Sequence, residues 1–373
     1  MSNELKLAQL DMDKINEGIA DRSNVFYWQT DRLVEPEQAG QIWADRHRYF
    51  TDDELLRRVN DVLSEGRLVS IAPLDLEAQT NLGNVSSVRT GKLESGEEVI
   101  MRCFPKGVRN GYFHSEAGAA ELACKAGLPS YKTLAIHDFS GGQDFAFHVL
   151  EKLQGTAVKV WLEANPKDEG MLLPQIGRMM ARVHKIQVNG FGPFDNELAK
   201  RGDLVGLHKN LSDAVRAGLI FNLDVLTKEK ILSSVQTEAI SKLFAGDNPL
   251  LASNQAVLVH NDFADWNLLT DGKDVTGILD WDESVGGDPI ADLACWSTFF
   301  EPERLHAFLE GYWQVADKPE DFQDRFELLR LRYVLSKMTL RIRRYSWDPS
   351  DFMKEKIETG KTHLAQSMEY FRI

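Results

Sequence analysis

Residues 257–269 read Val-Leu-Val-His-Asn-Asp-Phe-Ala-Asp-Trp-Asn-Leu-Leu, and this stretch decides how the whole chain is interpreted. It fits the pattern His-x-Asp-Φ-x-x-x-Asn, where Φ is apolar, and it opens with a short apolar run that predicts a strand. A second apolar run ends at Asp280, 13 residues after Asn267. His, Asp and Asn at one spacing arise by chance about 0.05 times in a chain of this length. The flanking apolar runs make coincidence rarer still, so the pattern indicates function.

Phosphoryl transfer needs side chains of these types. One carboxylate orients an attacking hydroxyl and accepts its proton, while an amide oxygen and another carboxylate hold Mg²⁺ against the nucleotide phosphates. Mg²⁺ prefers hard oxygen ligands and takes only a few of them from the protein. The sequence therefore predicts Asp262 as the base, with Asn267 and Asp280 as the metal ligands.

Composition limits the class of protein. The 373 residues are 43% apolar and 27% charged, which predicts a globular protein of one large or two modest domains. With 43 Lys+Arg against 57 Asp+Glu, the formal net charge of −14 argues against a nucleic-acid or membrane-surface partner. It would suit a cationic ligand, but an ordinary solvated surface is the better explanation. Three scattered cysteines, no leader pattern and no apolar run near 18 residues predict a cytoplasmic location without a membrane span.

Periodicity divides the chain into two lobes after an N-terminal helical extension at 1–60. Short β-prone runs separated by glycines predict antiparallel strands at 68–72, 85–89, 99–104, 134–139 and 145–150. A helix is expected at about 113–126, with Phe113, Ala117, Ala120 and Cys124 on one face and Gly127 as its cap. Beyond 155 the pattern is mainly helical, with Pro174 expected in the first turn of a helix and a hairpin around Asp271-Gly272. We expect lobes at 61–150 and 151–373, with a ligand cleft between them.

The motif segment resembles the aminoglycoside phosphotransferase (APH) family of small-molecule kinases, over about residues 68–300. Family patterns His-Gly-Asp-x-x-x-x-Asn, Ile-Asp-Trp-Glu/Asp and Gly-Asp-Pro-x-x-Asp-Leu-Ala correspond to residues 260–267, 279–282 and 287–294. Phe263 and the Phe-Gly-Pro-Phe run at 191–194 are similar to the hygromycin B phosphotransferase branch, and Asn261 stands where the family usually has Gly. The resemblance implies an α+β, protein-kinase-like bilobal fold, with a small antiparallel β-rich N-terminal lobe and a larger helical C-terminal lobe. It also implies ATP and Mg²⁺ as cofactors and a small-molecule hydroxyl as acceptor.

The resemblance also implies nucleotide contacts in the N-terminal lobe. Arg102, on the strand at 99–104, falls where kinases carry a phosphate-binding Lys, and Glu116 on the following helix is its expected ion-pair partner. Singly, each is explained as well by a solvated surface residue. The remaining nucleotide-binding positions are the phosphate loop, with Gly83, Ser86 and Ser87, and the hinge, with the backbone of Glu151 and Leu153.

The acceptor is the part that the sequence leaves open. Four residues beside the base would either bind a cationic acceptor or form a solvated acidic rim: Asp265, Trp266, Asp282 and Glu283. An amino-sugar antibiotic, and hence antibiotic resistance, is one expectation. A metabolite such as choline, a thioribose, homoserine, a fructosamine or another sugar is the alternative within this chemistry. A catalytically silent nucleotide-binding protein is the alternative outside it. Oligomeric state is not predicted. Four further residues are expected to be structural: His184, His260, Asp288 and Asp292.

Overall fold

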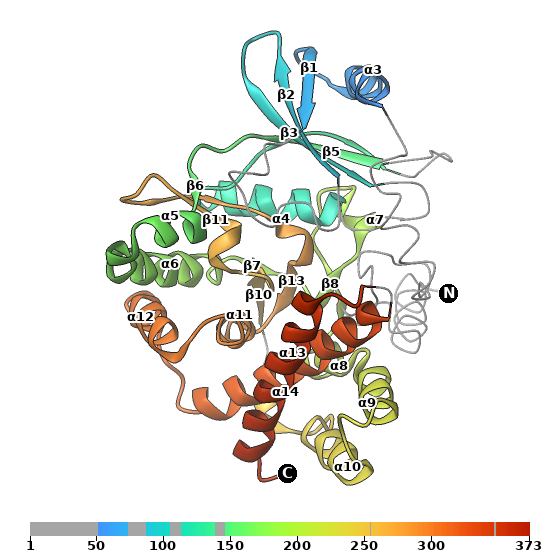
Figure 1. The fold of residues 1–373 in the computed structure, drawn as a ribbon, viewed down its shortest axis with the longest axis vertical. Coiled ribbons are helices and arrows are strands. Elements are labelled where there is room, and N and C mark those ends of the chain that lie inside the picture. Colours follow the sequence, from blue (N-terminus) through green and yellow to red (C-terminus); the bar gives the residue numbers. More distant parts are fainter. Residues whose placement is uncertain (1–50, 74–86, 105–112, 139–145, 254, 347) are drawn as a thin grey trace.

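The N-terminal lobe is a five-stranded antiparallel sheet with a helix on each face. The computed structural model describes residues 51–73, 87–104, 113–138, 146–253, 255–346 and 348–373. The strand order is β1-β2-β3-β5-β4, and the sheet forms the upper part of the molecule (Figure 1). The elements of this lobe are α3 (Asp52–Val62), β1 (Leu68–Pro73), β2 (Ser87–Leu93), β3 (Glu98–Phe104), α4 (Phe113–Lys125), β4 (Thr133–His137) and β5 (Ala146–Glu151).

Strand alternation decides which way Arg102 points. Side chains on β3 alternate between the two faces of the sheet, so Val99, Met101 and Cys103 are buried together against α3. Ile100 lies on the opposite face, where it packs into the core that contains α4. Arg102 shares that face because it is two residues further along the strand. The five predicted antiparallel strands are confirmed. Their ends agree within two residues, except that β2 runs to Leu93, four residues beyond its predicted end, and residues 85–86, 139 and 145 lie outside the described residues.

Helix α4 ends as predicted, and its predicted apolar stripe is buried in part. Gly127 has a φ of +70° and its amide bonds the Cys124 carbonyl at 2.9 Å, which is the expected glycine cap. Phe113 and Ala120 of the stripe are fully buried, whereas Ala117 and Cys124 are only half-buried. The buried face also includes Glu116, Ala119 and Ala123, which the predicted stripe left out. The helix contacts both the sheet and the segment at 281–283, and this second contact turns Glu116 inward.

The C-terminal lobe contains two small antiparallel sheets enclosed by helices. One sheet has the order β7-β10-β13-β8-β9 and the other β12-β11-β6. The predicted hairpin around Asp271-Gly272 is confirmed as β11 and β12. The strands are β6 (Thr156–Ala157), β7 (Gln187–Val188), β8 (Phe191–Phe194), β9 (Gly206–His208), β10 (Ala256–Val259), β11 (Leu268–Thr270), β12 (Val275–Ile278) and β13 (Val285–Gly287).

Helices make up most of the C-terminal lobe, and α13 and α14 lie side by side along it (Figure 1). The α-helices are α5 (Val158–Ala164), α6 (Glu169–Val183), α7 (Asn196–Ala199), α8 (Leu211–Arg216), α9 (Leu219–Lys228), α10 (Ser234–Leu243), α11 (Ile290–Trp296), α12 (Pro302–Tyr312), α13 (Phe322–Tyr345) and α14 (Asp351–Tyr370). The 3₁₀ turns are η1 (Pro166–Asp168), η2 (Pro249–Leu251), η3 (Asp265–Asn267) and η4 (Trp281–Glu283). None of the helices in the described ranges combines the length and apolarity needed to cross a bilayer.

Pro174 lies inside helix α6, not in its first turn, so that prediction was wrong. The helix begins five residues earlier, at Glu169, after the turn η1. Its apolar face packs closely on α12: a Cβ built on Gly177 would overlap the Phe308 carbonyl oxygen, and one on Gly311 would overlap the Pro174 carbonyl oxygen. This backbone contact stabilises a helix that proline alone would interrupt.

Candidate active site

Topology brings the two motif loops side by side. Residues 260–267 connect β10 to β11, and residues 279–284 connect β12 to β13. Strand β10 pairs with β13, while β11 pairs with β12, so both loops pass between the same two sheets. The Asn267 carbonyl accepts a hydrogen bond from the Leu279 amide at 2.8 Å, which joins the loops directly. Asp262 and Asp280 are thereby placed in one region although 18 residues separate them.

Asp262 and Asn267 form a closed hydrogen-bonded unit. The Asn267 Nδ2 group donates to the Asp262 backbone carbonyl at 2.9 Å and to its carboxylate Oδ2 at 3.0 Å. Both amide hydrogens are used in this way, so the amide oxygen is left as the polar atom that can meet a cation. Asn267 thus has the donor atom that a Mg²⁺ ligand requires.

A buried carboxylate, Asp292, fixes the start of the motif loop. It accepts the amide of His260 at 2.8 Å and that of Asn261 at 2.6 Å, and it lies 3.1 Å from His184 Nε2. The His260 ring donates from Nε2 to the Leu279 carbonyl at 2.9 Å. These histidines are packing residues, as predicted. Hydrogen bonds to the Asp292 carboxylate and to the Leu279 carbonyl therefore fix His260 and Asn261, the two residues before the base.

Asn261 adopts a left-handed backbone conformation, with φ +65°. This conformation is open to Gly and costs other residues about 1–2 kcal/mol, with Asn among the most tolerant. The side chain contributes a bond of its own, from Nδ2 to the Glu283 carbonyl at 3.3 Å. This position therefore requires a residue that tolerates positive φ, and Asn meets that requirement here.

Asp280 is also left-handed, with φ +63°, and its carboxylate is 40% exposed. Its Oδ1 lies 3.1 Å from Arg102 Nη2. In the described part of the chain no group of three or more His, Cys, Asp and Glu side chains converges as a metal centre. Asp280 and Asn267 would supply two oxygens, and a site completed by phosphate and water is the arrangement that Mg²⁺ adopts with nucleotides.

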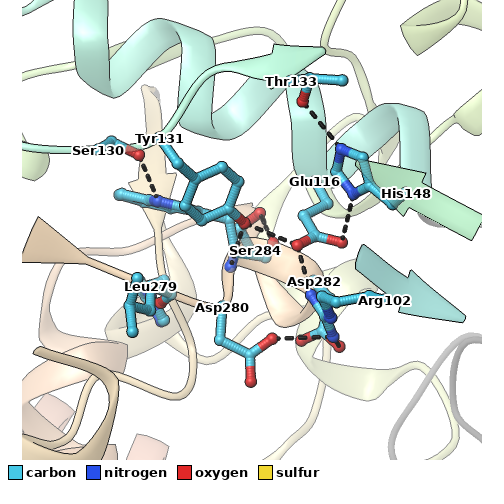
Figure 2. A network of polar contacts seen from close by, with 12 residues as sticks. Arg102, Glu116, Ser130, Tyr131, Thr133, His148, Leu279, Asp280, Asp282 and Ser284 are labelled. Carbon is cyan, nitrogen blue, oxygen red and sulfur yellow. Dashed lines mark hydrogen bonds and ion pairs between the residues drawn. The ribbon is translucent and has the colours of Figure 1, made fainter. Parts of the chain in front are cut away.

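Arg102 lies among three carboxylates (Figure 2). It forms an ion pair with Glu116, lies 2.9 Å from Asp282 Oδ2 and reaches Asp280 as described above. Burial would raise the pKa of Glu116, but Arg102, His148 and the Tyr131 hydroxyl together outweigh it and bring that pKa down to about 2. Burial, followed by the charge of Asp280, raises the pKa of Asp282 to about 8. The Arg102–Glu116 pair predicted from the sequence is present, and Asp282 joins it.

The four residues predicted for the acceptor separate into two groups. Asp282 and Glu283 line a cavity of about 180 Å³ beside Asn261. Asp265 instead turns into the lobe, where Arg304 Nη2 lies 3.0 Å from its Oδ2 and burial raises its pKa. Trp266 packs edge-on against Phe299 at 4.9 Å between ring centroids. The turn η3 thus directs Asp265 and Trp266 away from this cavity, and their contact with the acceptor stays a prediction.

The cavity lies in the C-terminal lobe, beneath the second motif loop. Three carboxylates line it, and each has a cationic partner: Asp282 with Arg102, Glu283 with Lys337 at 3.6 Å, and Asp288 with Arg325. Asp288 also caps α11 through the Ile290 amide at 2.9 Å, as expected of a structural residue. Sequence reasoning missed Lys337, Arg325 and Arg304, since they come from α12 and α13, whose periodicity indicates only amphipathic helices.

The N-terminal nucleotide-binding positions are covered only in part. Gly83 and Ser86 lie outside the described residues. Ser87 is fully buried at the start of β2, where its Oγ accepts from Arg89 Nη1 at 2.8 Å. The contact of this hydroxyl with phosphate stays a prediction. Glu151 ends β5, where its amide bonds the Lys132 carbonyl at 2.9 Å, and Leu153 follows at the junction between the lobes.

Comparisons with known proteins identify the family of this chain. A family model described as the phosphotransferase enzyme family (APH) matches residues 80–328, more than half of the chain. The chain therefore belongs to this family, and the predicted enzyme class, a phosphotransferase, is confirmed.

Hygromycin-B 4-O-kinase of Escherichia coli is 27% identical over 222 residues, which is 54% of this chain. That match spans 60% of the kinase, less than two thirds of its length. A thermostable mutant of aminoglycoside phosphotransferase APH(4)-Ia, in its apo form, superposes with a TM-score of 0.59 at 18% identity, over 86% of this chain and 99% of that one. A fructosamine-3-kinase-like protein of Thermobifida fusca YX-ER1 has a TM-score of 0.59 at 16% identity, over 84% and 99% of the two chains. These likenesses confirm the predicted bilobal α+β fold.

Proposed function

We propose that this protein transfers the γ-phosphoryl group of ATP, with Mg²⁺, to a hydroxyl of a small molecule. The observation that carries the proposal is the convergence of Asp262, Asn267 and Asp280 between the two small sheets, with Arg102 above them. We assign the nucleotide to the lobe at 61–150 and the acceptor to the lobe at 151–373. The scattered cysteines favour the cytoplasm, where ATP is available.

Each residue has one task in the proposed reaction. MgATP, when bound, supplies the phosphoryl group and neutralises the charge that develops on it. The Asp262 carboxylate, which accepts a hydrogen bond from Asn267, orients the acceptor hydroxyl and takes its proton. Arg102, kept in place by Glu116, binds phosphate oxygens through its planar guanidinium. The amide oxygen of Asn267 and the carboxylate of Asp280 would hold the metal.

An aminoglycoside of the hygromycin type is the first acceptor that we propose. The support is the relative named hygromycin-B 4-O-kinase, which is 27% identical over 222 residues. Asp282 and Glu283 would meet amino groups of such an acceptor at the cavity. To do so, those amines have to compete with Arg102 and Lys337, the cations that already pair with these carboxylates.

A neutral sugar is the second candidate acceptor, and the ion pairs of the cavity carboxylates favour it. Since each carboxylate of the cavity has a cationic neighbour, an uncharged polyol could bind there without displacing an ion pair. This candidate retains the chemistry and changes only the acceptor.

The test is release of ADP from MgATP with aminoglycosides, hygromycin B, choline and small sugars as acceptors. Asp262→Asn is expected to lower kcat by about 10²–10⁴-fold, the usual contribution of a general base, while MgATP still binds. Asp271→Asn is the matched control, because that exposed turn carboxylate only accepts backbone amides, a task that Asn also performs. Wild-type turnover in Asp262→Asn would overturn the assignment. MgATP binding without ADP release on any acceptor would favour the silent nucleotide-binding protein.

A further inference from the structure

The hydroxyl of Tyr131 meets the carboxylate that holds Arg102 in place. Tyr131 lies between α4 and β4, is 2% exposed, and donates to Glu116 Oε1 at 2.6 Å. The same oxygen accepts from Arg102 Nη1 (Figure 2). Burial, followed by the charge of Glu116, raises the pKa of Tyr131 well above its usual value, so the hydroxyl remains a donor.

The same hydroxyl reaches the second motif loop. It lies 3.4 Å from the backbone nitrogen of Trp281, the residue between Asp280 and Asp282. The segment before it is fastened to that loop as well. The Pro129 carbonyl accepts from the Ile278 amide at 2.7 Å, and Ser130 Oγ accepts from Trp281 Nε1 at 2.9 Å. Tyr131 is therefore positioned by the loop that carries Asp280.

The second oxygen of Glu116 is enclosed from the other side. His148 Nδ1 lies 3.4 Å from Oε2, and His148 Nε2 is fixed by Thr133 Oγ1 at 2.9 Å. Glu116 and His148 are fully enclosed by protein. Each oxygen of the Glu116 carboxylate therefore has a neighbour besides Arg102: Tyr131 at Oε1 and His148 at Oε2.

We propose that Tyr131 is a positioning residue: its hydroxyl fixes Glu116 and thereby aims the Arg102 guanidinium at the nucleotide phosphates. This rests on the proposed function insofar as Arg102 binds phosphate. The sequence motifs do not point to Tyr131, because it lies 149 positions before Asp280. This role affects binding of the nucleotide's phosphates and not of its adenosine, whereas general stabilisation of the lobe would affect both.

The experiment compares affinities of Tyr131→Phe for MgATP and for adenosine, both by calorimetry on the full chain. Loss of one hydrogen bond to a charged group is expected to lower the affinity for MgATP about tenfold. Adenosine, which has no phosphates, should bind as it does to the wild type. Equal weakening of both ligands, or no weakening of MgATP, would overturn the proposal.

Two further variants separate positioning from folding. In a Glu116→Gln background, Tyr131→Phe should lower the affinity for MgATP by no more than about threefold, because residue 116, the partner of the hydroxyl, has lost its charge. Full additivity of the two changes would contradict the proposal. Tyr370→Phe is the matched control, since the Tyr370 hydroxyl, on α14, also donates to a carboxylate, that of Asp324 on α13. Its MgATP affinity should equal that of the wild type.

The acceptor assay distinguishes failure of the proposed function from failure of this inference. Wild-type protein that binds MgATP but phosphorylates nothing would contradict the proposed reaction, and the affinity comparison would still decide the role of Tyr131. Wild-type turnover combined with unchanged MgATP affinity in Tyr131→Phe would leave the reaction standing and remove the positioning role.

Discussion

Removal of the Asp292 carboxylate should loosen the loop that carries the base. Asp292 is fully buried and accepts the amides of His260 and Asn261 at 2.8 and 2.6 Å, while His184 Nε2 lies 3.1 Å away. Asp292→Ala leaves three buried donors without an acceptor. Breaking a buried charged contact of this kind costs about 3–5 kcal/mol, because the groups left behind are already desolvated.

Urea unfolding followed by tryptophan fluorescence measures this cost, since Trp281 and Trp296 are fully buried beside the loop. For a slope of about 3 kcal/mol per molar urea, the midpoint of the C-terminal lobe should fall by about 1–2 M. Asp292→Asn should be milder, at about 1–3 kcal/mol, because the amide retains one acceptor oxygen but turns a donor toward a donor.

The control is Glu238→Ala, which removes a solvent-exposed carboxylate paired only with Lys242 one helical turn away. Its midpoint should match that of the wild type, because exposed pairs contribute little. The reasoning would be refuted by an Asp292→Ala midpoint within about 0.3 M of the wild type. It would equally be refuted by wild-type phosphoryl transfer in a folded Asp292→Ala protein.

Three further outcomes are expected. Gly177→Ala should destabilise the protein by about 1–3 kcal/mol in the same urea assay, because its Cβ overlaps the Phe308 carbonyl and forces two helices apart; an unchanged midpoint would contradict the packing. Asn261→Val should be destabilised and Asn261→Gly should not, since only Gly accepts φ +65° without strain; equal stability of the two would argue against that conformation. Burial raises the pKa of the Cys103 thiol to about 12, so a thiol reagent at pH 8 should leave Cys103 unmodified in native protein and label it after denaturation, as mass spectrometry of the peptide would check.

The pairing of Asp262 with Asn267 could be predicted because its information is local. Asp262 and Asn267 lie on one loop of fixed length, and the hydrogen bonds between them follow from that spacing. The strands before and after the loop are short apolar runs, which sequence patterns describe well. The Arg102–Glu116 ion pair was also predicted, since the order of motifs in the family that the chain resembles places both residues.

Other features of the site depend on contacts that no local pattern encodes. Arg102 reaches Asp282 across 180 positions, and this contact exists only because two sheets bring the second motif loop under β3. Asp265 looked equivalent to Asp282 in the sequence, yet Arg304 from α12 draws it into the lobe. Residue type alone did not separate the two carboxylates.

The sequence by itself determined the family and the residues proposed for catalysis, because spacing within one loop is a property of a short segment. Only the tertiary structure decided which carboxylates are neutralised, which face of α4 is buried and that Tyr131 contacts Glu116. The physical reason is burial: a charged or hydroxyl group removed from water must find a partner, and packing of distant elements decides which partner is there.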